Sequence, residues 1–253
     1  MYSYQGIDWI ILAFAAFFVG LSKTGIPGVG IFAIGLFTLV IPARESAGVV
    51  LPLLIAADMV AVATYWKDAH WAKLLRLFPW AIFGIIVGWL AMDHINNQQT
   101  ARLIGLILTV MVTLQLVRGW QKRRKPATHQ PNETLHGHTY TATMGSLAGF
   151  TTMVANAAGP IMNLYLVAMK MPKMAFMGTA AWYFFLLNSF KVPFSINLGL
   201  INSASFILNL KLIPAVLVGA LLGRYILPYI NQRVFELIAL GFALLAGLRL
   251  LFA

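Results

Sequence analysis

The feature that most constrains the fold of this chain is an apolar segment that is broken by glycines and occurs twice. The first copy spans residues 20–30 and reads GLSKTGIPGVG, and the second spans residues 149–160 and reads GFTTMVANAAGP. Gly20 and Gly30 thus recur as Gly149 and Gly159, 129 residues later. Hydrophobic segments interrupted at matching positions in two halves of a chain indicate the substrate site of a transporter.

The correspondence continues along both halves at slightly larger spacings. Matching residues stand 130 and then 135 positions apart: Gly48 with Gly178, Asp58 with Asn188, and Pro79, Gly84 and Gly88 with Pro214, Gly219 and Gly223. We therefore expect two structural repeats, residues 1–120 and 141–253. A basic and polar linker, residues 121–140, joins them.

The composition is that of a membrane protein. Hydrophobic residues make up 60% of the chain and charged residues 10%, with a mean hydropathy of +0.82. A soluble domain of this length could not cover so much apolar surface. Several stretches approach or reach the roughly 20 residues that span a bilayer. The N-terminal residues 1–8 hold no basic n-region and no small-residue cleavage site follows, so we expect residues 8–21 to form a retained helix rather than a signal peptide. These features predict an all-α polytopic membrane protein.

The lengths of the expected helices suggest how the halves are oriented. The first two of each half, near 7–22, 28–41, 141–154 and 160–170, hold about 14 residues or fewer on either side of a break. Such a helix covers about 21 Å of the roughly 30 Å hydrocarbon core. Each pair is a re-entrant hairpin or two short crossings. Three longer helices follow in each half, near 46–65, 74–92, 100–119, 175–191, 207–229 and 233–252. Each half then crosses the membrane an odd number of times, so the second half is inverted relative to the first. If each pair were instead one broken helix, the number of crossings would be even and the repeats would be parallel. We favour inverted repeats.

The net charge of +11 would indicate nucleic-acid binding in a soluble protein. Lysines and arginines of membrane proteins gather instead in cytoplasmic loops. Under the odd-crossing topology most of them fall on one side, together with the linker. We therefore expect a multi-pass protein of a bacterial inner membrane, with a cytoplasmic linker, both termini outside, and lipid rather than nucleic acid around it.

The two breaks have the chemistry of an anion site. Glycines let a ligand approach the backbone closely, and a restarting helix offers free N–H groups and a positive dipole end. Lys23 adds a full positive charge. We expect substrate to contact Ser22, Lys23, Thr24, Gly25, Gly28 and Gly30 of the first break and Thr151, Thr152, Asn156 and Gly159 of the second. Alternatively, the small residues serve close helix packing and Lys23 lies at the cytoplasmic interface.

Asp58 is an ionisable residue within an apolar helix, which makes it a functional candidate by default. Three roles are open: it carries a coupling proton, pairs with Lys23, or is a protonated structural carboxyl. While ionised, it should not touch an anionic substrate. Its counterpart Asn188 is a neutral near-isostere, and Asp58, Asn188 and Lys191 are together the candidates for coupling or gating. Lys191, three residues further on, marks the outer entrance of the pathway or is a snorkelling interfacial lysine.

Catalytic and metal-binding patterns are missing from the expected spans. They hold no Ser/His/Asp arrangement, no paired carboxylates and no His-Glu motif. His129, His136 and His138 lie in the linker and do not indicate a physiological metal site. We therefore expect neither an enzyme nor a cofactor. The small-xxx-small patterns at 84–88 and 219–223 would serve a homodimer or packing within one chain equally well.

Taken together, these motifs resemble the TauE/SafE family of sulfite and organosulfonate exporters. The resemblance rests on the segment 20–30, on PARESAG at 42–48, on YWKDAHW at 65–71 with the proline and glycines that follow, and on the restart at 147–160. It implies an inner-membrane protein of two related halves that moves small sulfur-containing anions, most often outward. At 155–160 this chain carries one glycine where many relatives carry more.

The residues and the resemblance together favour a secondary transporter that exports sulfite or a small organosulfonate by alternating access. A membrane potential that is negative inside drives a monovalent anion outward by about 2.3 kcal/mol per 100 mV, so no coupling ion is required. The alternative is a proton-coupled transporter of another small anion, such as a carboxylate, that uses Asp58. A more remote alternative is a membrane-embedded enzyme or assembly factor.

Overall fold

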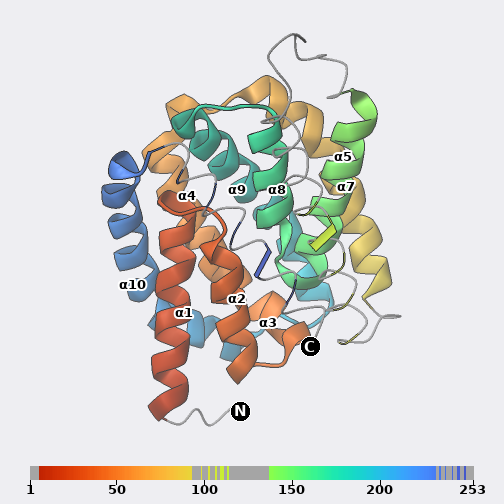
Figure 1. Ribbon diagram of the computed structural model, residues 1–253. Helices are drawn as coiled ribbons and strands as arrows, with labels where there is room; N and C mark the ends of the chain where they lie inside the picture. Colours follow the sequence, from red (N-terminus) through yellow and green to blue (C-terminus); the bar gives the residue numbers. More distant parts are fainter. Residues whose placement is uncertain are drawn as a thin grey trace.

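The computed structural model describes residues 6–92 and 137–231, with isolated helical positions between 98 and 113 and between 234 and 248. This part of the chain is helical and contains no strand. The first half forms α1 (Gly6–Thr24), α2 (Val29–Val40), α3 (Ala43–Val49), α4 (Leu51–Tyr65), the 3₁₀ turn η1 (Trp66–Asp68) and α5 (Trp71–Ala91). The second forms α7 (His138–Ala155), α8 (Ala158–Ala168), α9 (Lys173–Asn197), α10 (Ser203–Ile226) and the turn η3 (Leu227–Tyr229) (Figure 1). Most of the linker and of the expected helices near 100–119 and 233–252 lies outside the described residues.

Four stretches within the described residues are long and apolar enough to cross a membrane. They are Gly6–Thr24, Glu45–Asp68, Trp71–Ala91 and Ser203–Tyr229. The outer faces of α1 and α10 also carry large exposed apolar side chains, among them Ile10, Phe14, Val218 and Leu221. Apolar surface of this extent indicates contact with lipid rather than water. The prediction of an all-α polytopic membrane protein is confirmed.

The expectation that the first two helices of each half are both short was wrong for the first of each pair. α1 has 19 residues and α7 has 18, whereas α2 has 12 and α8 has 11. The reason is that Gly20 does not break its helix but lies within α1. The chain turns only later, at Gly28 with φ 95° and at Asn156 with φ 52°. Glycine and asparagine tolerate this left-handed conformation better than other residues.

Glycines bring α1 and α10 into backbone contact along one flank of the bundle (Figure 1). A Cβ atom on Gly20 would overlap the carbonyl oxygen of Val216, and one on Gly219 would overlap the carbonyl oxygen of Phe17. No larger side chain fits at either position without moving a helix. The glycines therefore set the distance between the first helix of one half and α10 of the other.

The same contact recurs between α7 and α5 on the opposite flank. A Cβ atom on Gly149 would overlap the carbonyl oxygen of Ala81, and one on Gly84 would overlap that of Ser146. Each of these residues is the counterpart of one in the α1–α10 interface, at the spacings of 129 and 135 residues found in the sequence. The first helix of each half, α1 or α7, thus packs against a helix of the other half, α10 or α5.

Helices α4 and α9 pack against each other between these two flanks. α4 carries Asp58 and α9 carries Asn188, and both side chains are buried. The matching polar residues of the two halves therefore meet inside the bundle rather than facing lipid.

The glycine contacts give a first prediction. Gly149→Ala and Gly219→Ala should each destabilise the protein by about 1–3 kcal/mol, because the added methyl overlaps backbone that must move. Gly6→Ala serves as the control, since a Cβ there meets nothing within 4 Å, and alanine favours a helix over glycine by about 1 kcal/mol. Thermal denaturation in detergent measures the difference. Variants at residues 149 and 219 as stable as the Gly6→Ala control would contradict the close packing.

Candidate functional site

The two chain breaks meet at one cavity inside the bundle. α2 begins after Gly28 and α8 after Ala157, and neither helix has a side-chain N-cap. Gly28, Gly30 and Gly159, which stand at these beginnings, all line the cavity. The first-turn N–H groups of two helices therefore lie beside the same space, where they can bind an anion.

The backbone of each break is hydrogen-bonded within the protein. The Tyr65 hydroxyl donates to the Thr24 carbonyl at 2.5 Å, at the end of α1. At the second break the backbone N–H groups of Asn156 and Ala157 donate to the Thr152 and Thr151 carbonyls at 3.0 and 3.1 Å, and the Asn156 side chain donates from Nδ2 to the Ala47 carbonyl of α3 at 2.8 Å. Irregular backbone within a membrane requires such internal partners. The polar side chains at the breaks thus have a structural role besides any contact with a ligand.

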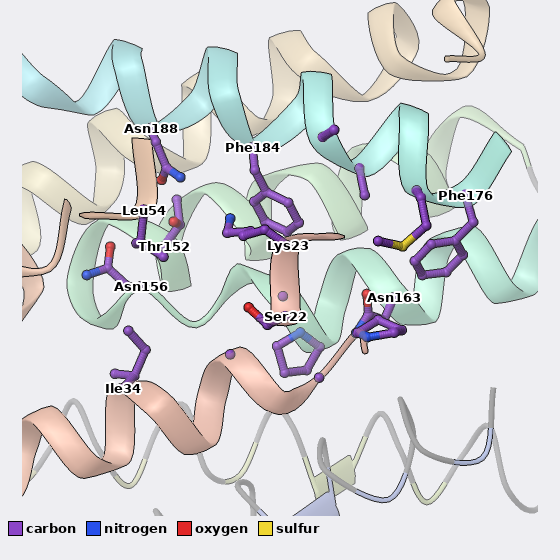
Figure 2. A pocket seen from close by; sticks show the side chains of 18 residues that line it. Ser22, Lys23, Ile34, Leu54, Thr152, Asn156, Asn163, Phe176, Phe184 and Asn188 are labelled. Atoms are coloured by element: carbon purple, nitrogen blue, oxygen red, sulfur yellow. The ribbon is translucent and has the colours of Figure 1, made fainter. Parts of the chain in front are cut away.

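The cavity has a volume of about 70 Å³. This is room for roughly five water molecules or for a small ion. Its wall combines polar groups with apolar ones (Figure 2). The lining residues are Ser22, Lys23, Pro27, Gly28, Gly30, Ile34, Leu54, Thr152, Asn156, Gly159, Pro160, Asn163, Phe176, Met177, Ala180, Ala181, Phe184 and Asn188.

An ion pair links the first break to α4. The Lys23 ammonium lies 2.8 Å from Oδ1 of Asp58, whose side chain is fully buried. Asn188 donates from Nδ2 to the other carboxylate oxygen at 2.6 Å. Lys23 also lies 4.0 Å from the centroid of the Phe184 ring, a cation–π contact. Of the three roles open to Asp58, pairing with Lys23 is the one this geometry shows, and Asp58 does not itself line the cavity.

Lys191 lies inside the bundle, so the expectation of a snorkelling interfacial lysine was wrong, while its place at an outer entrance stays a prediction. Its side chain is only 1% exposed. The ammonium donates to the Thr152 carbonyl at 2.6 Å, to Oγ1 of Thr152 at 3.2 Å and to Oδ1 of Asn156 at 2.5 Å. These three neutral acceptors use all three of its N–H donors. Spacing alone could not reveal this, because it depends on where α7 meets α9.

The charges around the cavity do not balance. Asp58 offsets Lys23, but no carboxylate of the described residues lies within ion-pair distance of Lys191. Thr152 and Asn156, which hold Lys191, are themselves part of the cavity wall. With Lys191 protonated, the three side chains Lys23, Asp58 and Lys191 together carry a formal charge of +1. Because a buried charge without a counter-charge is costly, an anion in the cavity would stabilise this arrangement.

The two halves place their lysines on different helices. Asp58 and Asn188 are matching residues 130 positions apart, and they bond to each other directly. Thr152 stands at the position that corresponds to Lys23, 129 residues later. In the first half the lysine is Lys23 on α1. In the second half it is Lys191 on α9, which donates a hydrogen bond to Thr152, the residue that corresponds to Lys23.

Three of the expected site residues do not line the cavity. Thr24 donates from Oγ1 to the Ala220 carbonyl at 2.6 Å, and Gly25 packs against Gly223. Thr151 is fully buried and donates to carbonyls of its own helix. The structure thus places these residues in helix interfaces beside the site. The other expected substrate contacts all line the cavity.

The hydroxyls on the wall differ in what they can offer. Ser22 donates to the Val19 carbonyl at 2.8 Å, so its hydroxyl faces the cavity only as an acceptor. Thr152 accepts from Lys191, which leaves its own proton available to an anion. Lys23, Thr152 and the N–H groups of the two helix beginnings are therefore the donors that the expected residues provide.

Asn163 is a lining residue that the sequence reasoning missed. It lies on α8 and is 4% exposed. It stands four residues after Gly159, a spacing that places both on one face of the helix. An amide in an otherwise apolar helix, on the face of a predicted site residue, is the signal that could have revealed it.

Apolar spans around a small cavity lined by polar and apolar side chains define an integral membrane protein. The family model for the sulfite exporter TauE/SafE matches residues 12–250, nearly the whole chain. The chain therefore belongs to this family, as its motifs suggested. Comparison with curated proteins and comparison with solved structures each gave no match.

The buried ion pair gives a second prediction. Lys23→Met leaves the Asp58 carboxylate buried without a counter-charge and should destabilise the protein by about 3–5 kcal/mol. Adding Asp58→Asn removes the lone charge and should restore most of this loss. Denaturation of the two single variants and the double variant in detergent measures the coupling. A double variant whose loss equals the sum of the single losses would contradict a direct pair.

Proposed function

We propose that this protein is a secondary transporter that exports sulfite or a small organosulfonate across the inner membrane by alternating access. Membership of the TauE/SafE family supports the class of substrate. The observation that carries the proposal is the buried ammonium of Lys191, which no described carboxylate balances. It lies behind a cavity at which two helices begin.

The binding mode follows from the donors on the cavity wall. The anionic head would accept hydrogen bonds from the Lys23 ammonium, the Thr152 hydroxyl and the first-turn N–H groups of α2 and α8. Lys191, behind Thr152, would supply the balancing charge. Asp58 would stay paired with Lys23 and behind the wall, where it does not repel the substrate. A volume of about 70 Å³ suits sulfite or a short sulfonate.

The membrane potential is sufficient to drive export. A monovalent anion gains about 2.3 kcal/mol per 100 mV on leaving a negative interior. Asp58 is held by Lys23 at 2.8 Å and by Asn188 at 2.6 Å, which favours a structural carboxylate over a proton carrier. The contacts therefore support uncoupled export more than proton-coupled carboxylate transport.

Alternating access would come from rocking of two inverted repeats about the cavity. The matching glycine interfaces, Gly20 and Gly219 in one and Gly149 and Gly84 in the other, support a two-fold relation between the halves. The cytoplasmic linker and the external termini remain predictions that follow from the charge distribution.

The proposal gives a third prediction, on anion binding. Sulfite should raise the melting temperature of the purified protein. The Lys191→Met variant should need at least a tenfold higher sulfite concentration for the same rise. Lys211→Met is the matched control, because Lys211 is exposed on α10 and contacts the Trp9 ring. The melting temperature without ligand shows whether each variant folds. Stabilisation by sulfite that survives in Lys191→Met would contradict the proposed role of the buried charge.

A fourth prediction concerns coupling. In proteoliposomes loaded with ethanesulfonate, which stays monovalent across the usable pH range, an inside-negative potential should accelerate efflux. Dissipating the pH gradient at fixed potential should leave the rate unchanged. Efflux that instead follows the pH gradient, and loses this dependence in Asp58→Asn, would establish the proton-coupled alternative.

A further inference from the structure

One buried donor on the cavity wall has no partner within the described part of the chain. The Asn163 side chain on α8 is 4% exposed, and its amide Nδ2 makes no hydrogen bond there. An unpaired buried polar group costs about 1–3 kcal/mol. Asn163 lines the cavity, so a ligand that contacts this side chain would give the amide a partner.

The position of Asn163 gives the cavity two different ends. Figure 2 shows Asn163 near Phe176 at one end and Thr152, Asn156 and Asn188 at the other. Lys23 lies between them, with its nitrogen facing the Thr152 end. The charged groups therefore gather at one end, and a single neutral donor stands at the other.

The α9 side of the cavity wall is apolar between the two ends. Phe184, Ala180, Ala181 and Met177 line this side, so it suits methylene groups rather than further oxygen atoms. The volume of about 70 Å³, room for roughly five waters, exceeds what the three oxygens of sulfite fill. A ligand that uses the whole cavity has an anionic head, a short carbon chain and a polar tip.

The repeat does not account for this amide. The counterpart of Asn163 in the first half, 129 residues earlier, is Ile34, which also lines the cavity. The same place in the architecture is thus filled by an apolar side chain in one half and by an unpaired donor in the other. Ile34 shows that helix packing at this place does not require an amide. An amide here would serve the recognition of an asymmetric ligand.

We propose that Asn163 is a specificity-determining residue that donates from Nδ2 to an oxygen at the far end of the substrate. The proposal rests on the function proposed above and deepens it. The sulfonate lies at the Lys23 and Thr152 end, and a hydroxyl, carbonyl or carboxylate oxygen one or two carbons away accepts from Asn163. The preferred substrates are short sulfonates with a second oxygen acceptor, bound more tightly than sulfonates that end in a methyl group.

Two ligands that differ by one hydroxyl test this assignment. Isethionate, which is 2-hydroxyethanesulfonate, and ethanesulfonate have the same charge and nearly the same size. Titrated against the purified full chain by thermal shift, isethionate should bind about 3- to 10-fold more tightly, the effect of one hydrogen bond. Asn163→Leu should abolish this preference, because it should weaken the binding of isethionate and leave that of ethanesulfonate unchanged.

Asn209→Leu is the matched control. Asn209 is a second buried asparagine without side-chain partners in the described residues, at 1% exposure, but it does not line the cavity. This variant should keep the full preference for isethionate. Asn163→Ala provides a second test if the leucine variant fails to fold, and it too should lose the preference. A merely structural role for Asn163 would change the melting temperature of the variants and leave the preference intact.

The outcomes separate this inference from the proposed function. If sulfite and both sulfonates bind but the wild type shows no preference, or the preference survives in the Asn163 variants, the role of Asn163 is overturned and the anion site stands. If neither sulfite nor either sulfonate binds, the proposed function is overturned together with this inference. A preference lost only in the Asn163 variants supports both.

Discussion

Hydrocarbon offers no hydrogen-bond partners, and the rest of this structure depends on that constraint. A chain that stops and restarts two helices within a membrane must bury the turns in protein. The close glycine contacts of α1 with α10 and of α7 with α5 bring enough protein around the breaks to do so. Tyr65 then supplies a partner for the Thr24 carbonyl at the first break, and the Asn156 side chain ties the second break to α3. The cavity lies where these covered turns meet.

The two halves share an architecture but differ in their charges, and this difference is what gives the site its character. The pair formed by Lys23 and Asp58 is neutral as a whole, whereas Lys191 is held by carbonyl, hydroxyl and amide oxygens alone. Two identical halves would have placed equal chemistry on both sides of the cavity. Here the lysines lie toward one end and the neutral amide of Asn163 at the other, which is the basis for the proposed direction of a bound sulfonate.

Much of the site could be predicted from residue types and spacing, and the remainder could not. Lys23, Thr152 and Asn156 line or frame the cavity because each sits beside a break. Thr24 and Thr151 are adjacent to site residues but point into helix interfaces, since successive residues of a helix face in different directions. Asn163 was not predicted because it lies within α8, beyond the break, and the prediction covered only residues at the breaks.

The sequence by itself determined that the chain is a helical membrane protein with matching breaks, because composition and glycine spacing are local properties. It also determined that Asp58 and Asn188 correspond. Only the tertiary structure decided that these two residues bond to each other, that Lys191 is buried without a carboxylate partner, and that Asn163 lines the cavity. The reason is physical: burial and pairing depend on which faces of distant helices meet, and residue spacing within one segment does not fix those contacts.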